Sequence, residues 1–350
     1  MESEEFLLVR DLLRSFATRY RMDSADEVKP AARTAAQQAL DELGLAELRA
    51  TALPVATVQE CALLAEEHGR QPLTTSLLGT VLLAPEVTRL LGDGSAATGA
   101  VPTVALAPDL RFPGPTPSRL VAWDCEGADG ALCVDAEGTV SQAELGPPAP
   151  TADLLRSVRT AYPGPVVGRL NPQAHQQWQA YALVIVASEL VGAAGAFVEL
   201  SVDYARERRQ YGRPIGSFQA VQHLLADATT LVEAAASATR YAAWCLDHEP
   251  PGRALTAARV AKAEVDVSAV EAVYAGMQVF GGIAQTWEHV AHLYLRKVLL
   301  GATVLATTSD LLPVLAEPEA ALADPKAALV EPKPALVEPK ATLVEPEAAR

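Results

Sequence analysis

Residues 208–219 read RRQYGRPIGSFQ, a turn-forming stretch between two long segments that carry few helix breakers. No proline occurs between Pro172 and Pro214, and Asn171-Pro172 supplies a helix N-cap followed by proline at the first helical position. The sequence therefore predicts one helix over 173–209 that ends at the quoted stretch. Pro or Gly bounds three further helical segments, over 218–247, 253–280 and 287–312. Four long helices joined by short turns favour an antiparallel four-helix bundle.

The middle of the first long helix, residues 181–198, is apolar enough to resemble a membrane span. It carries Glu189 near its centre, and polar side chains flank it on both sides. A charge at that depth of a bilayer is costly, whereas a buried bundle helix can provide it with partners. We expect a core helix of the bundle.

The chain before the bundle divides into two parts. Apolar residues recur at helical spacing in the segments 6–20, 30–43 and 57–68, which predicts an N-terminal helical domain over 1–96. Short apolar runs then alternate with Pro, Gly and Asp clusters, which predicts a reduced β domain with a small sheet over 97–169. With a four-helix bundle over 170–313, the predicted fold class is mainly α with a small central β domain.

Residues 314–350 repeat a seven-residue unit, as in VLAEPEA, ALADPKA and ALVEPKP. Each unit contains a proline, which removes a backbone donor and clashes with the preceding helical turn at a cost of about 3 kcal/mol. The period of seven therefore does not indicate a coiled coil. We expect an extended, disordered tail that acts as a linker or solubility tail, with a partner-binding motif as the alternative.

Composition limits the partners. The 350 residues contain 28 Lys+Arg and 43 Asp+Glu, a net charge of −15, which repels phosphate backbones and anionic lipid. No basic patch of useful size offsets this charge, so we expect neither nucleic acid nor a membrane as partner. Four scattered cysteines without zinc-ligand spacing and an acidic start predict reduced thiols in a cytoplasmic protein.

A second stretch, residues 277–289, reads MQVFGGIAQTWEH and follows the third bundle helix. Together with residues 208–219 it resembles the C-terminal half of the acyl-CoA dehydrogenase flavoproteins, whose pattern is close to R-x-x-[FY]-G-x-x-[IL]-x-x-x-Q and Q-x-x-G-G. The resemblance covers residues 170–300 and agrees with the helix–β–helix order of the chain. It implies an FAD cofactor, α,β-desaturation of an acyl-CoA or acyl-carrier-protein thioester, and a homo- or hetero-oligomer whose subunits share the flavin.

The resemblance also implies which residues hold FAD. The residues of the turn that would touch the flavin are Arg208, Gln210, Tyr211, Phe218 and Gln219. The residues that would hold the adenosine diphosphate end are Gln278, Gly281 and Gly282. An arginine is a bidentate donor suited to pyrophosphate, and paired glycines at a helix end let backbone N–H groups approach anionic oxygens. Considered alone, Arg208 would be interpreted as a solvated helix-end cation and the glycine pair as a helix cap. The spacing of the two motifs together favours a cofactor-binding role instead.

The sequence departs from the family pattern in the β segment. Residues 105–109, ALAPD, stand where members carry a Tyr/Leu-x-x-Thr/Ser-Glu strand, and no Trp-x-Ser/Thr strand follows. These departures speak against an isoalloxazine pocket of the chain's own.

The catalytic base of the family is also missing. Its glutamate has two known positions, which fall near Leu305 and near Ala182, and neither carries an acid. Glu189 lies two helical turns after Ala182 on the same face. Burial among apolar residues would raise its pKa and suit it to act as the base. The alternative is a structural carboxylate that is hydrogen-bonded within the bundle.

Three functions remain open. The first is a subunit of a heteromeric acyl-CoA dehydrogenase that supplies the adenosine-side clamp, while its partner supplies the flavin-ring pocket and the base. The second is a flavin-free enzyme of the same fold, a dehydratase or cyclase in secondary metabolism, and the third is a non-catalytic structural subunit. His289 and His292 have the spacing of a helical metal pair, but surface or interface roles are commoner, and we assign no metal.

Overall fold

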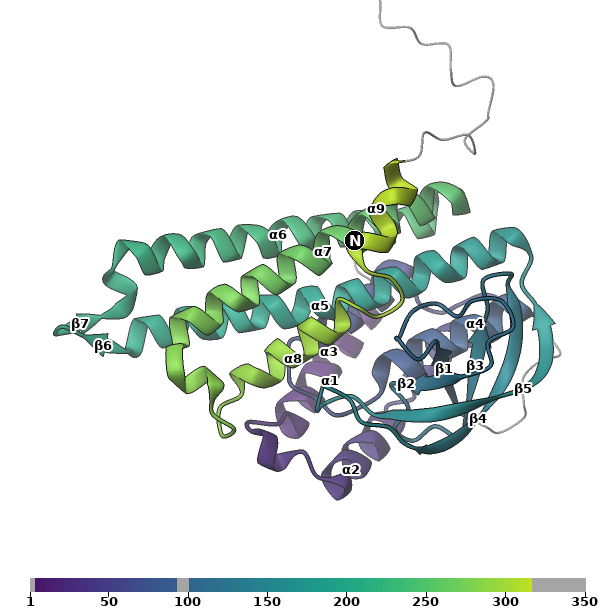
Figure 1. The fold of residues 1–350 in the computed structure, drawn as a ribbon, viewed down its shortest axis with the longest axis horizontal. Coiled ribbons are helices and arrows are strands. Elements are labelled where there is room, and N and C mark those ends of the chain that lie inside the picture. Colours follow the sequence, from purple (N-terminus) through teal and green to yellow (C-terminus); the bar gives the residue numbers. More distant parts are fainter. Residues whose placement is uncertain (1–3, 93–100, 317–350) are drawn as a thin grey trace, which may run out of the picture. The chain divides into compact units, whose positions relative to one another are not determined.

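The computed structural model describes residues 4–92 and 101–316. Helices come first, strands follow, and long helices complete the chain (Figure 1). The predicted fold class, mainly α with a small central β part, is confirmed. The boundaries predicted for the separate domains stay a prediction. The predicted disordered tail lies outside the described residues, except for residues 314–316, which end the last described helix.

The N-terminal part is built from short helices around an apolar core. Thr57 begins one of them with a capping box, in which its hydroxyl accepts from the Glu60 N–H and the Glu60 carboxylate accepts from the Thr57 N–H. A buried π-helical segment, Leu77–Leu83, leads directly into the last of them. The helices are α1 (Glu4–Tyr20), α2 (Pro30–Asp41), α3 (Val58–Gly69) and α4 (Ala84–Leu91).

The strands close into a barrel, where the sequence predicted only a small sheet. Their order around the barrel is β1-β2-β5-β4-β3, and β1 and β3 close it by parallel pairing. The interior is filled mostly by alanine and cysteine side chains, because a barrel of this size has little room inside. The strands are β1 (Pro102–Leu106), β2 (Leu120–Trp123), β3 (Gly130–Val134), β4 (Thr139–Pro148) and β5 (Val158–Arg169).

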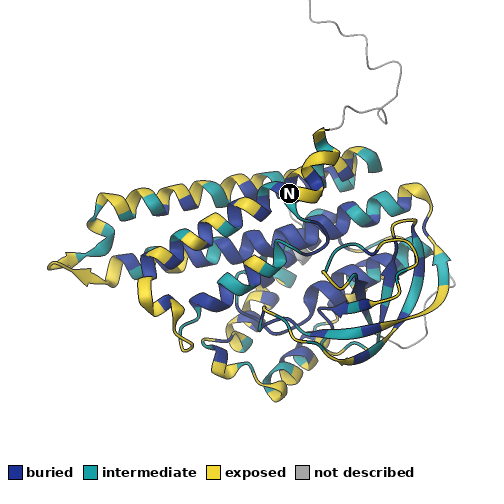
Figure 2. Cartoon of the chain, in the orientation of Figure 1, coloured by how far each residue is buried: buried dark blue, intermediate teal, exposed yellow. Residues whose placement is uncertain are grey.

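The C-terminal bundle is organised around one central helix, α5 (Pro172–Glu207), which Figure 2 shows buried along its middle and exposed toward its ends. Asn171 caps its start by accepting from the Ala174 N–H at 2.9 Å. Two described helices are long and apolar enough to cross a membrane, and the apolar windows of α5 and α7 are 94% and 50% buried. The helices that pack around α5 are α6 (Gln219–His248), α7 (Pro251–Phe280) and α8 (Ala291–Gly301), and the short α9 (Thr308–Ala316) follows them.

Glycines let α3 and α5 cross at very short range. A Cβ atom at Gly69 would lie 2.1 Å from the Glu189 carbonyl oxygen, and one at Gly192 would lie 1.9 Å from the Glu66 carbonyl oxygen. No side chain fits at either position without separating the helices. This close crossing brings the N-terminal helices against the middle of α5.

The fourth bundle helix differs from its prediction. The sequence predicts one helix over 287–312, but α8 ends at Gly301 and the chain leaves helical geometry before α9 begins. The Leu305 N–H donates to the Leu110 carbonyl at 2.8 Å, and the Phe112 N–H donates to the Leu305 carbonyl at 3.0 Å. The buried Lys262 ammonium donates to the Ala306 carbonyl at 3.1 Å. These tertiary hydrogen bonds replace the helical ones and fasten the loop to the connection between β1 and β2.

Candidate functional site

The two sequence stretches that predict a cofactor site lie at the same end of the bundle. At this end α5 finishes, α6 starts and α7 finishes (Figure 1). The rings of Tyr204 on α5 and Phe280 on α7 are 4.6 Å apart, so the two helix ends are in contact. Arg208 follows Tyr204 by four residues, and Gly281 follows Phe280 directly. We call residues 208–219 and 278–283 together the open end.

A tight hairpin carries the first stretch. It consists of β6 (Arg209–Gln210) and β7 (Arg213–Pro214), joined by Tyr211 and Gly212, which have φ angles of 51° and 78°. Positive φ at both central residues of a two-residue loop defines a type I′ turn, whose twist matches that of the strands. The base of the hairpin is closed by the Ile215 N–H, which donates to the Arg208 carbonyl at 2.7 Å. The turn presents the Tyr211 side chain to solvent, with 93% of its surface exposed.

Several predicted cofactor residues are free to bind. Within residues 4–92 and 101–316, the side chains of Arg208, Gln210 and Gln278 are exposed and make no hydrogen bond or ion pair. Phe218 is half-buried under the Arg213 guanidinium, which lies 4.1 Å from its ring, and the Gln219 amide lies 3.0 Å from His223 Nε2. The open end therefore offers exposed arginines without ion-pair partners in the described chain, Arg208 among them, together with two unpaired amides and an aromatic surface.

The paired glycines have different roles. Gly281 ends α7 with a φ of 67°, and its N–H donates to the Met277 carbonyl, so this N–H is not available to a ligand. Cβ atoms at Gly281 and Gly282 would meet no atom within 4 Å, so packing within the chain does not require a glycine at position 282. The C-terminal end of α7 carries a partial negative charge. An anionic group placed there needs a cation, and the Arg208 guanidinium can supply it.

The stretch that stands in place of the family's flavin-ring strand packs against the loop after α8. Residues 105–112 meet the loop 302–307, and we call this contact the closed junction. Leu106 at the end of β1 and Leu305 in the loop are each 2% exposed. Leu305 also has a φ of 70°, a strained conformation for a leucine that the flanking hydrogen bonds maintain. The remaining cavity beside it measures 260 Å³, below the size of most ligand pockets.

Glu189 lies in a buried network of charges, which we define by His68, Asp124, Arg156, Glu189 and Lys297. The Glu189 carboxylate accepts from Arg156 at 2.5 Å, from Lys297 at 3.1 Å and from His68 Nδ1 at 3.1 Å. Arg156 also donates to Asp124 at 2.7 Å, and its guanidinium lies 4.7 Å from the Trp123 ring. The network joins α3, α5 and α8 to the loops around the barrel.

The predicted rise in the pKa of Glu189 is wrong. Burial does act to raise this pKa, but the charges of Arg156 and Lys297, with the hydrogen bond from His68, outweigh burial and hold it well below its ordinary value. Burial also lowers the pKa of His68, so the neutral ring donates through Nδ1 and accepts from the Thr75 hydroxyl through Nε2. Both carboxylate oxygens of Glu189 accept hydrogen bonds from basic side chains. This geometry favours a structural role for Glu189 over a catalytic one.

His289 and His292, which have the spacing of a helical metal pair but to which we assign no metal, are engaged in structural contacts. The Ala291 N–H donates to His289 Nδ1 at 3.1 Å, and His292 Nε2 donates to the Trp287 carbonyl at 3.1 Å. In the part of the chain that the structure describes, no cluster of His, Cys, Asp and Glu side chains is arranged to hold a metal ion.

Sequence reasoning did not find the partners of Glu189. His68, Arg156 and Lys297 lie 121, 33 and 108 residues away from it in the chain. The signal in the sequence was the single acid within an apolar helix, which requires partners when it is buried. That signal does not say which basic residues supply them.

Comparison with known proteins defines the class. The fold is similar to the structure titled Tcur3481-Tcur3483 steroid ACAD, with a TM-score of 0.72 and 23% identity, over 89% of this chain and 96% of that one. It is also similar to the ChsE4-ChsE5 complex from Mycobacterium tuberculosis, with a TM-score of 0.70 and 18% identity, over 90% and 97%. A family model for the acyl-CoA dehydrogenase C-terminal domain matches residues 181–304.

Sequence relatives complete the identification. Acyl-CoA dehydrogenase IpdE2 of Mycolicibacterium smegmatis is 31% identical over 253 residues, which cover 70% of this chain and 74% of that protein. The chain belongs to the acyl-CoA dehydrogenase family. IpdE2 of Mycobacterium tuberculosis is 39% identical over 132 residues, which cover 37% of this chain and 39% of that protein, so this match spans about two fifths of the relative.

Proposed function

We propose that the chain is one subunit of an FAD-dependent acyl-CoA dehydrogenase that desaturates an acyl thioester between its α and β carbons. In this assembly it holds the adenosine side of a flavin that a partner subunit binds at the ring. The observation that carries the proposal is the contrast between Arg208, exposed without a partner, and Leu305, buried where the family has one of its bases.

The open end fits the adenosine side of FAD. The Arg208 guanidinium can donate two parallel hydrogen bonds to a pyrophosphate, which no side chain of the described residues competes for. The Gln278 amide and the unobstructed backbone at Gly282 lie at the adjoining end of α7. Tyr211 and Phe218 provide aromatic surface beside the cation. In a chain with a net charge of −15, a cluster of arginines on one hairpin is the local exception that an anionic cofactor needs.

The closed junction supports a partner that supplies the ring pocket and the base. When bound, FAD supplies the acceptor for the hydride that leaves the β carbon. In this chain the loop 302–307 positions no acid for the α proton, and the pKa of Glu189 is held low by charges that already bind both of its oxygens. The residues of this chain bind and orient one end of the cofactor, and the proton transfer falls to a carboxylate of the partner.

The partner that fits is a second subunit of the same family. Two similar structures carry paired names in their titles, Tcur3481-Tcur3483 and the ChsE4-ChsE5 complex, which supports a heteromeric arrangement over a homomeric one. The substrate class is an acyl-CoA or acyl-carrier-protein thioester. Four buried cysteines without disulfides agree with a cytoplasmic location.

A flavin-free enzyme of the same fold is the second candidate, and the closed junction is the observation that favours it. A non-redox reaction still requires an acid or base that faces the substrate. The charges paired with Glu189 argue against that residue in this role. A purely structural subunit would need neither the unpaired arginine nor the open backbone at Gly282.

The proposal is tested by flavin content in the assembled complex. The chain is co-expressed with a candidate partner subunit of the same family, the complex is purified, and the released FAD is quantified for wild type, Arg208→Ala and Arg253→Ala. Arg253 is a matched exposed arginine on α7, paired with Glu249 at the opposite end of the bundle. We expect Arg208→Ala to assemble normally but lose FAD, with affinity reduced at least about tenfold for a charge-assisted bidentate contact.

The outcomes separate the three functions. Equal flavin content in wild type and Arg208→Ala would show that Arg208 does not hold the cofactor. If the chain purified alone contains stoichiometric FAD, the proposal that two subunits share the site is wrong. A colourless complex that still converts an acyl thioester establishes the flavin-free enzyme instead.

A further inference from the structure

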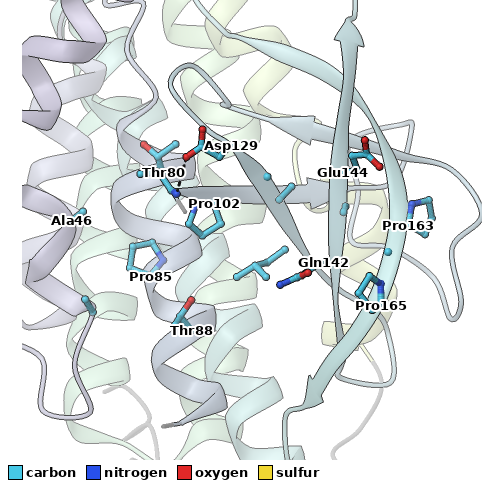
Figure 3. Close-up of a pocket in the computed structure, with 17 residues that line it drawn as sticks. Ala46, Thr80, Pro85, Thr88, Pro102, Asp129, Gln142, Glu144, Pro163 and Pro165 are labelled. Carbon is cyan, nitrogen blue, oxygen red and sulfur yellow. Dashed lines mark hydrogen bonds between the residues drawn. The ribbon is translucent and has the colours of Figure 1, made fainter. Parts of the chain in front are cut away.

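A second cavity lies between the N-terminal helices and the barrel. It measures 620 Å³, within the range of small-molecule sites. Figure 3 shows helical residues, among them Thr80, Pro85 and Thr88, along one wall, and strand residues, among them Gln142 and Pro165, along the opposite wall. The cavity therefore separates the N-terminal helices from the outer strands of the barrel.

This cavity is independent of the cofactor site. The lining residues that the structure describes come from the N-terminal helices, the barrel strands and their connections, and none of them from the bundle helices α5 to α9. The cavity is lined by Pro102 at the start of β1. Residues 105–109, which stand where the family carries its flavin-ring motif, begin at the end of this strand and continue past it. Neither the open end nor the closed junction contributes to it.

Rigid backbone keeps the cavity open. Pro163 and Pro165 flank Gly164 in β5, where the pairing with β4 shifts register between Ser141 and Ala143. A Cβ atom at Gly164 would lie 2.9 Å from the Gln142 carbonyl oxygen, so the two strands approach closely there. Proline rings on both walls resist collapse and lack backbone N–H groups. The walls are consequently apolar and poor in hydrogen-bond donors.

Apart from the Gln142 amide, the polar side chains of the described lining offer acceptors, and the Asp129 carboxylate also accepts from the Val101 N–H at 3.3 Å. Asp129 and Glu144 are the charged residues in the lining that the structure describes, and both are acids. The Thr80 hydroxyl donates to the Ser76 carbonyl at 2.7 Å and the Thr88 hydroxyl donates to the Ala84 carbonyl at 3.2 Å, so both offer only lone pairs to a ligand. An anionic ligand would meet repulsion at the rim, and a cation would meet attraction.

We propose that this cavity binds a small apolar molecule that carries a cationic head group. The apolar body occupies the space between α4 and the strands, and the head group lies near Asp129 and Glu144. The charge pattern excludes the acyl-CoA thioester, whose phosphates are anionic. The site is thus separate from the proposed dehydrogenase reaction and does not depend on it.

The test compares two probes of equal chain length and opposite charge. Decylammonium and decanoate are titrated into the full-length protein by calorimetry at neutral pH, below the concentrations at which they form micelles. We expect decylammonium to bind about tenfold more tightly, since each of two exposed acids contributes a few-fold. Equal affinities, or tighter binding of decanoate, would overturn the proposal.

Variants separate binding in the cavity from the general attraction of an acidic protein for cations. The double variant Asp129→Asn/Glu144→Gln should lose the tenfold preference. The double variant Asp227→Asn/Glu233→Gln changes the net charge equally on the exposed face of α6 and should keep it. Thr88→Trp, which fills the cavity from α4, should abolish binding of both probes. If the two double variants behave alike, or if Thr88→Trp binds decylammonium as wild type does, the site does not exist.

Discussion

Arg208 and Arg156 place the same guanidinium in opposite settings. Arg156 is buried, paired with Asp124 and Glu189 and stacked over Trp123, and its pKa is raised because these carboxylates outweigh the cost of burial. Arg208 is exposed at the open end and pairs with no described residue. The first arginine is committed to holding helices and barrel together, and the second is available to bind an anion. Substitutions in the two regions should therefore affect different properties.

The largest expected effect on stability comes from Glu189→Gln. This change leaves Lys297 and part of Arg156 as buried cations without a counter-charge, which we expect to lower the free energy of unfolding by about 3–5 kcal/mol. Glu207→Gln is a matched control near the end of α5, where the side chain is exposed, and should change it by less than about 0.5 kcal/mol. Urea unfolding of the purified variants measures both.

The pH dependence of stability gives the same test an independent readout. Because the folded-state pKa of Glu189 is depressed, its contribution is complete above its ordinary value of about 4.5 and is lost as the pH falls toward the folded value. Wild type should consequently lose more stability than Glu189→Gln between about pH 5 and pH 3. A variant with unchanged stability and reduced turnover would instead identify Glu189 as the base.

A smaller loss is expected from Leu305→Ala at the closed junction. Removing a leucine side chain that is 2% exposed leaves a cavity that its hydrogen-bonded loop cannot close, at a cost of about 2–4 kcal/mol. Ile283 at the open end is 45% exposed, and Ile283→Ala should cost less than about 0.5 kcal/mol. Thermal or urea unfolding distinguishes them. Similar losses for both variants would contradict the contrast between a closed and an open region.

Leu305→Ala should affect flavin content far less than it affects stability. It should leave the FAD content of the complex unchanged, because in the proposed assembly the partner binds the ring. A large loss of FAD from this variant would place the ring in this chain and contradict the division between subunits.

Local signals explain which elements the sequence could predict. Pro172 begins α5 and Gly281 ends α7, because these residues act within one turn of their own position. The long strands β4 and β5 escaped prediction because both contain prolines, which normally argue against a strand. They form in a barrel with register shifts that accommodate the prolines.

Long-range contacts explain what the sequence could not predict. The residues after Gly301 have a composition compatible with helix, but hydrogen bonds to Leu110 and Phe112, nearly two hundred residues earlier, turn the chain away. The direction of the pKa shift of Glu189 likewise depends on basic residues on other elements. Tertiary partners decide these features, and a single sequence does not identify them.

The smallest expected effect on stability is a gain, from Tyr211→Asn in the hairpin of the open end. Tyr211 has a φ of 51°, a left-handed conformation that is unfavourable for a tyrosine and well tolerated by asparagine in a type I′ turn. We expect the substitution to raise the free energy of unfolding by about 0.5–1 kcal/mol. Chemical unfolding of the complex measures this gain.

Natural proteins accept such strain mainly where a side chain serves a function. If the Tyr211 ring contacts the shared cofactor, Tyr211→Asn should retain less FAD although it is more stable, while Tyr211→Phe should keep both the strain and the flavin. If Tyr211→Asn gains stability and retains all its FAD, Tyr211 does not contact the cofactor. The proposed contacts would then come from Arg208 and the end of α7. The strained tyrosine would then be a feature of the turn alone, with no part in the difference between the two regions.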